Sequence, residues 1–241
     1  MANRTRRSAG LGAAALAAGL VAGMTGVGDG RAEEPPRAKP VRPGPAPEAS
    51  PARGGAKDGA RTACERELAR LGARFERIDP VIGEGGCGVS RPYNVRQIAH
   101  GVSLAPDTIL TCEAALATAR WVRDAVVPAA RAMGGGARLS AITHATTYDC
   151  RGRNNQPDAK LSEHAKGTAI DISGFGFVGH EPIAVMARAG RGTIEEAFQR
   201  AVRAAACLHF TTVIGPGADA FHDDHLHLDL ARRSRGYRLC Q

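Results

Sequence analysis

The chain has 241 residues, of which 43% are hydrophobic, so it suits one domain with terminal extensions. Its formal net charge is +8, but residues 1–61 hold ten of the Lys and Arg against five Asp and Glu, which leaves 22 against 19 in the remainder. Because the basic excess lies mainly in this first part and no nucleic-acid-binding motif occurs, the composition argues against a nucleic-acid partner.

Residues 1–32 have the pattern of an export signal. A start with three arginines precedes an uncharged run at 8–23 that is rich in Ala, Leu and Gly, and small residues follow at 30–32. The run is short and weakly apolar for a membrane span, which needs about 20 strongly apolar residues. We expect general secretion to the periplasm or the exterior of the cell envelope, with an uncleaved anchor as the alternative.

Residues 33–61 are predicted to be a disordered linker. Seven of the 14 prolines lie between positions 35 and 51, among Ala, Gly and charged residues. Such a segment buries too little apolar surface to offset its ordering entropy, and its prolines keep it semi-extended. The folded domain is therefore expected to span residues 62–241.

The first half of this domain shows two helical patterns. Apolar spacing predicts a helix over 64–74, followed by an extended segment at 75–80 and a glycine-rich turn at 83–88. This turn lacks the Lys-Ser/Thr ending of a phosphate loop. Thr111 is the expected N-cap of a long helix that Pro128 should kink or break.

The second half is predicted to alternate strands with one further helix. Strands are expected at 137–150, 168–172, 211–214 and 225–230, and a polar loop at 151–157. Residues 193–196 (Thr-Ile-Glu-Glu) read as a capping box. The buried stripe of the helix that it opens is expected to be Ile194, Phe198, Ala201, Val202, Ala205 and Leu208.

Two histidine-containing stretches offer ligands for one zinc ion. His164 and Asp171 belong to the first stretch (162–171), and His225 and His227 to the second (222–229). On a strand, residues two apart share a face, so both imidazoles of the second stretch would point the same way. Catalytic zinc sites use three N/O ligands and keep a position for water, a description that His164, Asp171 and His227 fit.

The residues of these stretches also carry a resemblance. Ser-x-His-x-x-Gly-x-Ala-x-Asp at 162–171 resembles the first metal motif of D-Ala-D-Ala carboxypeptidases. His-x-x-His-x-His at 222–227 resembles the second histidine stretch of penicillin-insensitive murein endopeptidases. The overall pattern, with TYDCR at 147–151 and VIGP at 213–216, is most similar to the bacterial extensin-like C-terminal domain family. The resemblance implies the fold shared by these peptidases and the hedgehog signalling domain. We expect an α+β domain with a small antiparallel sheet that carries the zinc site and helices on one side.

The resemblance and the residue chemistry suggest roles around the zinc ion, which would lower the pKa of its water to about 7. Asp224 and His225 compete as the base, and His225 is favoured because Asp224 would point away from His227 on a regular strand. His222 is a further polar contributor. Arg151 is the best match to an arginine that holds substrate in the resembled peptidases.

Four other polar residues near the two stretches have weaker cases. Arg153 is the second match to the substrate-holding arginine, after the one at 151. Ser162 reads as a local cap or a ligand-orienting hydroxyl, because no nucleophile-elbow motif is present. Asp223 and Asp229 are expected to be outer partners of the ligands or solvated charges.

Six cysteines follow the export signal, at 64, 87, 112, 150, 207 and 240. An even count in an exported chain favours three disulfides over metal-binding or catalytic roles. Sequence alone does not select among the pairings. A bond between Cys207 and Cys240, which would pin the C-terminus, is our one specific expectation.

These observations support three functional hypotheses. The first is an exported, monomeric zinc peptidase or amidase that acts on the peptide part of peptidoglycan, without a stable membrane span once the signal is removed. The second is a non-catalytic zinc-binding module for the cell wall or a protein partner. The third is a disulfide-stapled structural domain without metal.

Overall fold

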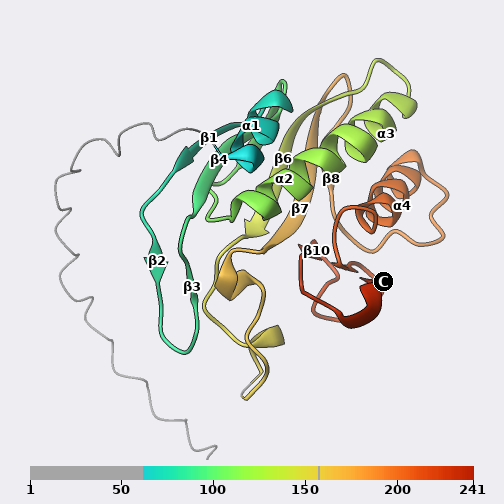
Figure 1. Ribbon diagram of the computed structural model, residues 1–241. Coiled ribbons are helices and arrows are strands. Elements are labelled where there is room, and N and C mark those ends of the chain that lie inside the picture. Colours follow the sequence, from blue (N-terminus) through green and yellow to red (C-terminus); the bar gives the residue numbers. More distant parts are fainter. Residues whose placement is uncertain (1–61, 157) are drawn as a thin grey trace, which may run out of the picture. The chain divides into compact units, whose positions relative to one another are not determined.

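The computed structural model describes residues 62–156 and 158–241 (Figure 1). The predicted export signal at 1–32 and the predicted linker at 33–61 lie outside the described residues. Among those that are described, no helix has the length and apolar character needed to cross a membrane.

The described helices comprise four α-helices and four shorter turns of other helix types. They are α1 (Ala63–Arg70), α2 (Cys112–Trp121), η1 (Val122–Val126), α3 (Val127–Ala132), η2 (Arg153–Asn155), η3 (His164–Lys166), α4 (Ile194–Ala206) and η4 (Ser234–Gly236). The strands are β1 (Arg74–Arg77), β2 (Val81–Ile82), β3 (Gly88–Val89), β4 (Tyr93–Ala99), β5 (Val102–Ala105), β6 (Arg138–Thr146), β7 (Ala169–Val178), β8 (Ile183–Ala184), β9 (Thr212–Ile214), β10 (Leu226–Asp229) and β11 (Leu239–Cys240). The expected α+β class is confirmed.

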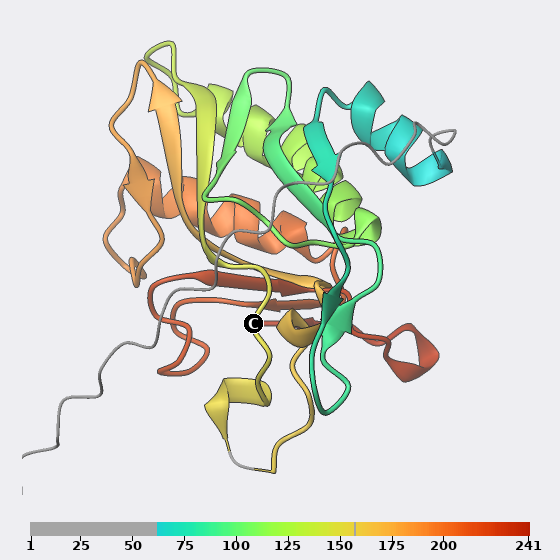
Figure 2. The ribbon, with the colours of Figure 1, turned by 90° about the vertical axis from the view of Figure 1, so that its left-hand side faces the viewer.

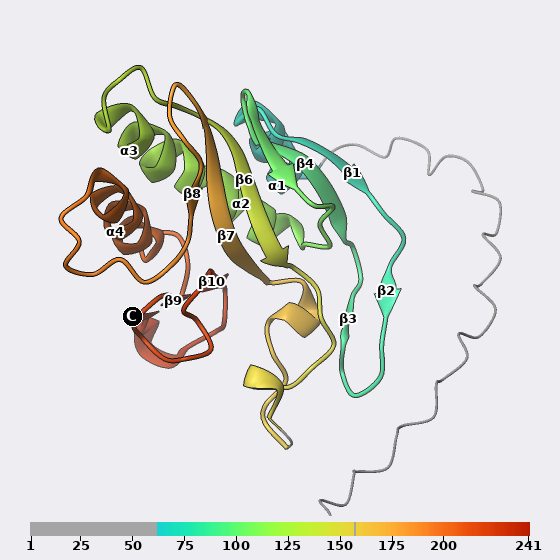
Figure 3. The same ribbon diagram turned by 180° about the vertical axis from the view of Figure 1, so that it is seen from behind.

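A single large sheet organises the domain. Its strand order is β1-β4-β5-β6-β7-β10-β9-β11, with β8 paired to β7 as a ninth strand. The expectation of a small antiparallel sheet is confirmed only in part. Strands β7 and β10, which carry two of the candidate ligands, are antiparallel, but the sheet has nine strands, and β5 pairs with β6 and β9 with β11 in parallel. Helices α2 and α3 cover one face of this sheet (Figures 1 and 3). The hydrophobic core lies between these layers.

The first helix is shorter than its apolar pattern predicts. It begins at a capping box, in which the Thr62 hydroxyl accepts from the Glu65 backbone N–H and the Glu65 carboxylate accepts from that of Thr62. It ends at Arg70 rather than Arg74, because Gly72 adopts a φ of +87°. The chain is then free to enter β1.

The long central helix is interrupted as its proline predicts. Thr111 is confirmed as the N-cap of α2, since its hydroxyl accepts from the Ala114 backbone N–H. Pro128 lies in the first turn of α3, after the π-helical η1. Because proline has no N–H to donate, one backbone hydrogen bond is missing there, and the π-helical η1 replaces the regular α-helical pattern just before it. Trp121 at the junction is fully buried and donates to the Val202 carbonyl of α4 at 2.9 Å.

Helix α4 has the expected cap but a different buried face. The Thr193 hydroxyl accepts from the Glu196 backbone N–H at 3.2 Å. The Glu196 carboxylate accepts instead from the backbone N–H groups of Gly190 and Gly192, so the predicted reciprocal box is not formed. Part of the predicted stripe is also wrong, because Leu208 is 77% exposed. The buried face comprises Glu196, Phe198, Gln199, Val202 and Ala206.

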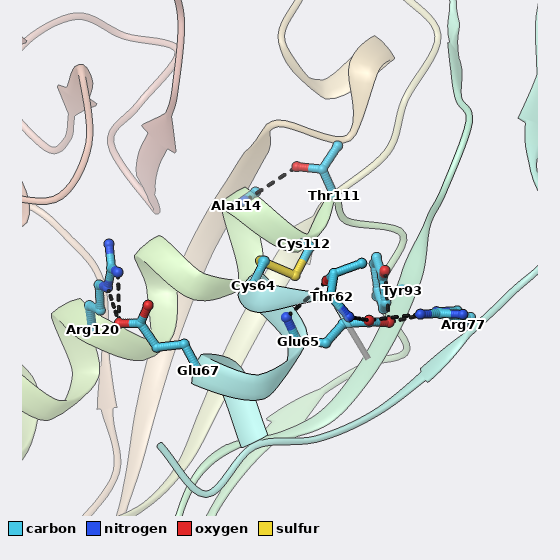
Figure 4. The surroundings of a disulfide bond; sticks show 10 residues. All are labelled: Thr62, Cys64, Glu65, Glu67, Arg77, Tyr93, Thr111, Cys112, Ala114 and Arg120. Carbon is cyan, nitrogen blue, oxygen red and sulfur yellow. Dashed lines mark hydrogen bonds and ion pairs between the residues drawn. A yellow bond between two sulfur atoms is a disulfide. The ribbon is translucent and has the colours of Figure 1, made fainter. Parts of the chain in front are cut away.

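All six cysteines form disulfides. The expected Cys207–Cys240 bond is confirmed, and the two bonds left open by the sequence are Cys64–Cys112 and Cys87–Cys150. The first of these joins α1 to the start of α2 (Figure 4). The second joins the β2–β3 turn to the loop after β6, both of which extend from the same end of the sheet (Figure 2). Each such bond contributes about 2–4 kcal/mol.

Candidate metal centre

The first histidine motif forms a tight turn that leads directly into the sheet. His164 opens the short η3 helix, and Gly167 ends it with a φ of +64°. A side chain at this glycine would place Cβ 2.8 Å from Cγ2 of Val89. The position therefore requires glycine on both conformational and steric grounds. Strand β7 begins two residues later and carries Asp171.

Strand pairing brings the second motif to the first. Strands β7 and β10 are antiparallel, and His227 is in register with Asp171. Cross-strand neighbours in register share a face of the sheet. Leu226 and Leu228 alternate to the opposite face, where both are fully buried. The apolar positions of β10 thus fix which face its histidine occupies.

The three predicted ligands meet in a triangle of side-chain atoms. His164 Nε2 lies 3.1 Å from His227 Nδ1 and 3.1 Å from Asp171 Oδ2. His227 Nδ1 lies 2.9 Å from Asp171 Oδ1. These separations are slightly shorter than the edge of about 3.3 Å that follows from zinc–ligand bonds of about 2.0–2.1 Å in a tetrahedron.

The outer nitrogen of each imidazole is held by an acceptor. His164 Nδ1–H donates to the Thr147 carbonyl at 3.1 Å, and His227 Nε2–H donates to Asp229 Oδ2 at 3.1 Å. Because each outer nitrogen carries a proton, each inner nitrogen of a neutral ring presents a lone pair to Asp171. Carbonyl or carboxylate partners of this kind orient histidines that ligate metals. This donor set fits a divalent cation such as zinc.

Electrostatics favours positive charge at the same point. Burial alone would lower the pKa of His227, but its hydrogen bonds to Asp171 and Asp229 outweigh this effect and raise the pKa to about 9. Burial alone would raise the pKa of Asp171, but hydrogen bonds with His164 and His227 hold it well below its usual range. The carboxylate is therefore ionised at neutral pH.

The two candidate bases lie beside the triangle in different positions. His225 Nε2 is 3.7 Å from Asp171 Oδ1, and its Nδ1 lies 2.8 Å from Asp224 Oδ1. The Asp224 side chain is 90% exposed. The structure thus places the imidazole between the triangle and the carboxylate.

His222 lies next to His227 on β10 and to His225, which precedes this strand. The centroid of the His222 ring is 5.2 Å from that of His225 and 5.8 Å from that of His227. The Asp219 carboxylate lies 2.6 Å from His222 Nδ1 and also accepts the Phe221 backbone N–H. This aspartate, which sequence reasoning missed, holds the loop before β10.

A pocket of about 400 Å³ contains the triangle and the surrounding candidates. Its lining residues include the two candidate arginines. The Arg151 guanidinium donates to Asp149 at 2.7 Å, whereas Arg153 is exposed. The Ser162 hydroxyl accepts from the His164 backbone N–H at 3.3 Å, which is the local-cap position expected of it.

The sequence did not identify the partner of one candidate ligand, and for the other it left two options open. The carbonyl of Thr147 has no side-chain signal, so nothing in the sequence identifies it as the anchor of His164. Asp229 was one of two options for an outer partner, and the other, Asp223, instead accepts from the Gly217 backbone at 3.4 Å. Alternation alone does not separate them, because both positions have the parity of His227. Asp229 lies within β10 beside His227, whereas Asp223 precedes the strand.

A family model described as "Extensin-like protein C-terminus" matches residues 62–241. No curated protein and no solved structure was found to match the chain.

Proposed function

We propose that the chain, which belongs to the extensin-like protein C-terminus family, is an exported zinc-dependent peptidase or amidase that acts on peptidoglycan peptides. The observation that carries the proposal is the triangle of His164, Asp171 and His227, whose outer nitrogens are held so that three lone-pair donors face one point. This triangle opens into the pocket of about 400 Å³. We also propose that the chain is related to the zinc carboxypeptidases and endopeptidases and shares their hedgehog-type fold.

In this proposal, His164 Nε2, His227 Nδ1 and one oxygen of Asp171 hold the zinc ion. When bound, zinc supplies Lewis-acid chemistry that polarises a scissile carbonyl and makes water a better nucleophile. Thr147 and Asp229 keep the two imidazoles in the tautomers that ligation requires.

The same proposal assigns proton transfer to His225. Its Nε2 faces the triangle at 3.7 Å from Asp171, so it is within reach of a water positioned there. It would take a proton from the attacking water and return it to the leaving amine nitrogen, so that the ring ends each cycle unchanged. Asp224 would orient the ring through Nδ1 rather than act as the base, because its own side chain faces solvent.

Two further residues would bind rather than react. Arg151 lines the pocket and keeps its guanidinium fixed by Asp149, in a position to hold a substrate carbonyl. His222 packs against the two other histidines of its stretch and would stabilise their arrangement. The predicted export signal would place this site in the periplasm or at the exterior of the cell envelope, where peptidoglycan peptides are found.

The test is digestion of peptidoglycan by the zinc-loaded, oxidised protein, with the products analysed by mass spectrometry. We expect released peptides, and a fall in rate of about 10²–10⁴ for His225→Ala with zinc content retained. His180→Ala is the matched control, because His180 does not line the pocket. Absence of any released peptide under zinc-replete conditions would reject the enzymatic proposal.

One observation favours the alternative of a non-catalytic zinc-binding module. Asp224 occupies the sequence position at which the resembled carboxypeptidases carry a catalytic Glu, yet its side chain is 90% exposed. A binding module would retain zinc and release nothing from peptidoglycan. It would also keep its affinity for wall fragments in His225→Ala, whereas the enzyme would lose turnover.

A further inference from the structure

Most charged groups that line the pocket already have an oppositely charged or imidazole partner. The Glu163 carboxylate lies 2.9 Å from the Lys166 ammonium, and Arg151 is paired with Asp149. The acidic groups at 171, 219 and 229 each contact a histidine. The first two pairs balance their charges, and the three aspartates are engaged by imidazoles.

Two arginines of the lining differ from this pattern. Within residues 62–156 and 158–241, neither Arg153 nor Arg233 forms an ion pair. Arg153 is exposed and opens η2. Arg233 is partly buried and lies on the chain segment that leaves β10. Of the two, Arg233 is therefore the more buried.

The guanidinium of Arg233 is held in place by neutral groups. Its Nη2 donates to the Thr212 hydroxyl at 2.7 Å, and its Cζ lies 5.8 Å from the centroid of the Tyr237 ring. Thr212 on β9 is the cross-strand neighbour of Asp229, the partner of His227. The guanidinium is thus fixed relative to the metal triangle without being neutralised. A fixed planar guanidinium is well suited to bind a carboxylate.

We infer that Arg233 recognises a carboxylate on the ligand and makes the pocket selective for peptides that carry a carboxylate close to the reacting amide. The inference rests on the proposed function and specifies its substrate class. The ligand would place its reacting amide at the triangle and its carboxylate at Arg233. Ile214, Phe221 and Leu239, which also line the pocket, offer apolar contacts to the remainder of the peptide. The exposed fraction of Phe221 is 57%, so its ring is accessible to such a ligand.

The test uses NMR titration to compare the equilibrium binding of N-acetylalanine and N-acetylalaninamide to the zinc-loaded protein. Wild type is expected to prefer the acid, and Arg233→Gln to lose about tenfold to 100-fold of that preference. Arg235→Gln is the matched control, because it removes the same charge two residues away and outside the pocket. We expect it to change the preference by less than about twofold.

A third probe identifies which carboxylate of the ligand Arg233 binds. N-acetylglutamic acid with its main-chain carboxyl amidated carries the charge on the side chain only. If Arg233→Gln weakens this probe more than N-acetylalanine, the ligand carboxylate is a side-chain group. The reverse result assigns it to a peptide C-terminus.

Three results would overturn the inference. They are a preference that survives in Arg233→Gln, an equal loss in Arg235→Gln, and loss of zinc from Arg233→Gln. The last would mean that Arg233 acts on the metal ligands through Thr212 and Asp229. Because the probes report binding alone, a protein that binds them as expected but digests no peptidoglycan would reject the proposed function and retain this inference.

Discussion

Substitution of Asp229 by Asn should weaken zinc binding while leaving the fold intact. Asp229 is 6% exposed and uses both carboxylate oxygens. Oδ2 accepts from His227 Nε2–H at 3.1 Å, and Oδ1 accepts from the Ala231 backbone N–H at 2.9 Å. An asparagine has one oxygen and one NH₂ group, so it cannot accept at both points.

Either orientation of the asparagine has a cost at the site. If its NH₂ group faces His227, Nε2 must accept, and the ring proton moves to Nδ1, the nitrogen that would ligate zinc. If its oxygen faces His227, the NH₂ group meets the Ala231 N–H, and two donors oppose each other. Loss of such an outer partner typically lowers metal affinity by 10- to 100-fold, or about 1.4–2.7 kcal/mol.

The assay is competitive zinc titration against a chromophoric chelator, with circular dichroism as the check on folding. Asp223→Asn is the matched control, because Asp223 is exposed and its one hydrogen bond among the described residues is accepted from the Gly217 backbone N–H. The expected order is a large loss of affinity for the Asp229 variant and none for the control. Equal zinc affinity in the Asp229 variant and wild type would refute the role that we assign to this carboxylate.

Three further predictions concern parts of the domain that support the site. Arg77 lowers the pKa of Glu65 to about 2, so this carboxylate stabilises the fold above its unfolded pKa of 4.5 and loses that effect as the pH falls toward 2. Glu65→Gln should lower the free energy of unfolding in urea by about 2–3 kcal/mol at pH 7. The difference from wild type should vanish as the pH falls from 4.5 toward 2. Gly167→Ala should lower the free energy of unfolding by about 1–3 kcal/mol in the same assay, and an unchanged value would contradict the steric account of the turn. Replacement of Cys87 and Cys150 by Ser should lower zinc affinity about tenfold, because this disulfide anchors the loop that carries the Thr147 carbonyl, which orients His164. Removal of the Cys207–Cys240 disulfide should leave zinc affinity unchanged. Equal losses of affinity in the two variants would contradict this prediction.

Part of the cluster of His164, Asp171 and His227 could be predicted, because some of its determinants are local. Two motifs supplied the residue types, and the alternation of Leu226 and Leu228 fixed the face on which His227 lies. The turn at Gly167 followed from a residue whose conformational freedom is visible in the sequence. In contrast, the register that opposes His227 to Asp171 depends on pairing between strands far apart in the chain.

The size of the sheet could not be predicted for the same reason. Strands β4 and β5 drew no prediction, and β7 extends to Val178, six residues beyond the expected end at 172. Strand β11 forms by parallel pairing with β9, next to the Cys207–Cys240 bond. Such strands owe their formation to tertiary pairing and packing rather than to local propensity. The hydroxyl and guanidinium of the Thr212–Arg233 pair likewise meet only after the C-terminal segment folds back.

The most direct test of the account is the zinc content of the oxidised wild-type protein beside that of His227→Ala. The triangle predicts about one zinc per chain in the wild type and its loss from the variant, with both proteins folded. Folded, oxidised wild-type protein that takes up no zinc would contradict the account, and it would remove the basis for both the enzymatic and the zinc-binding proposals.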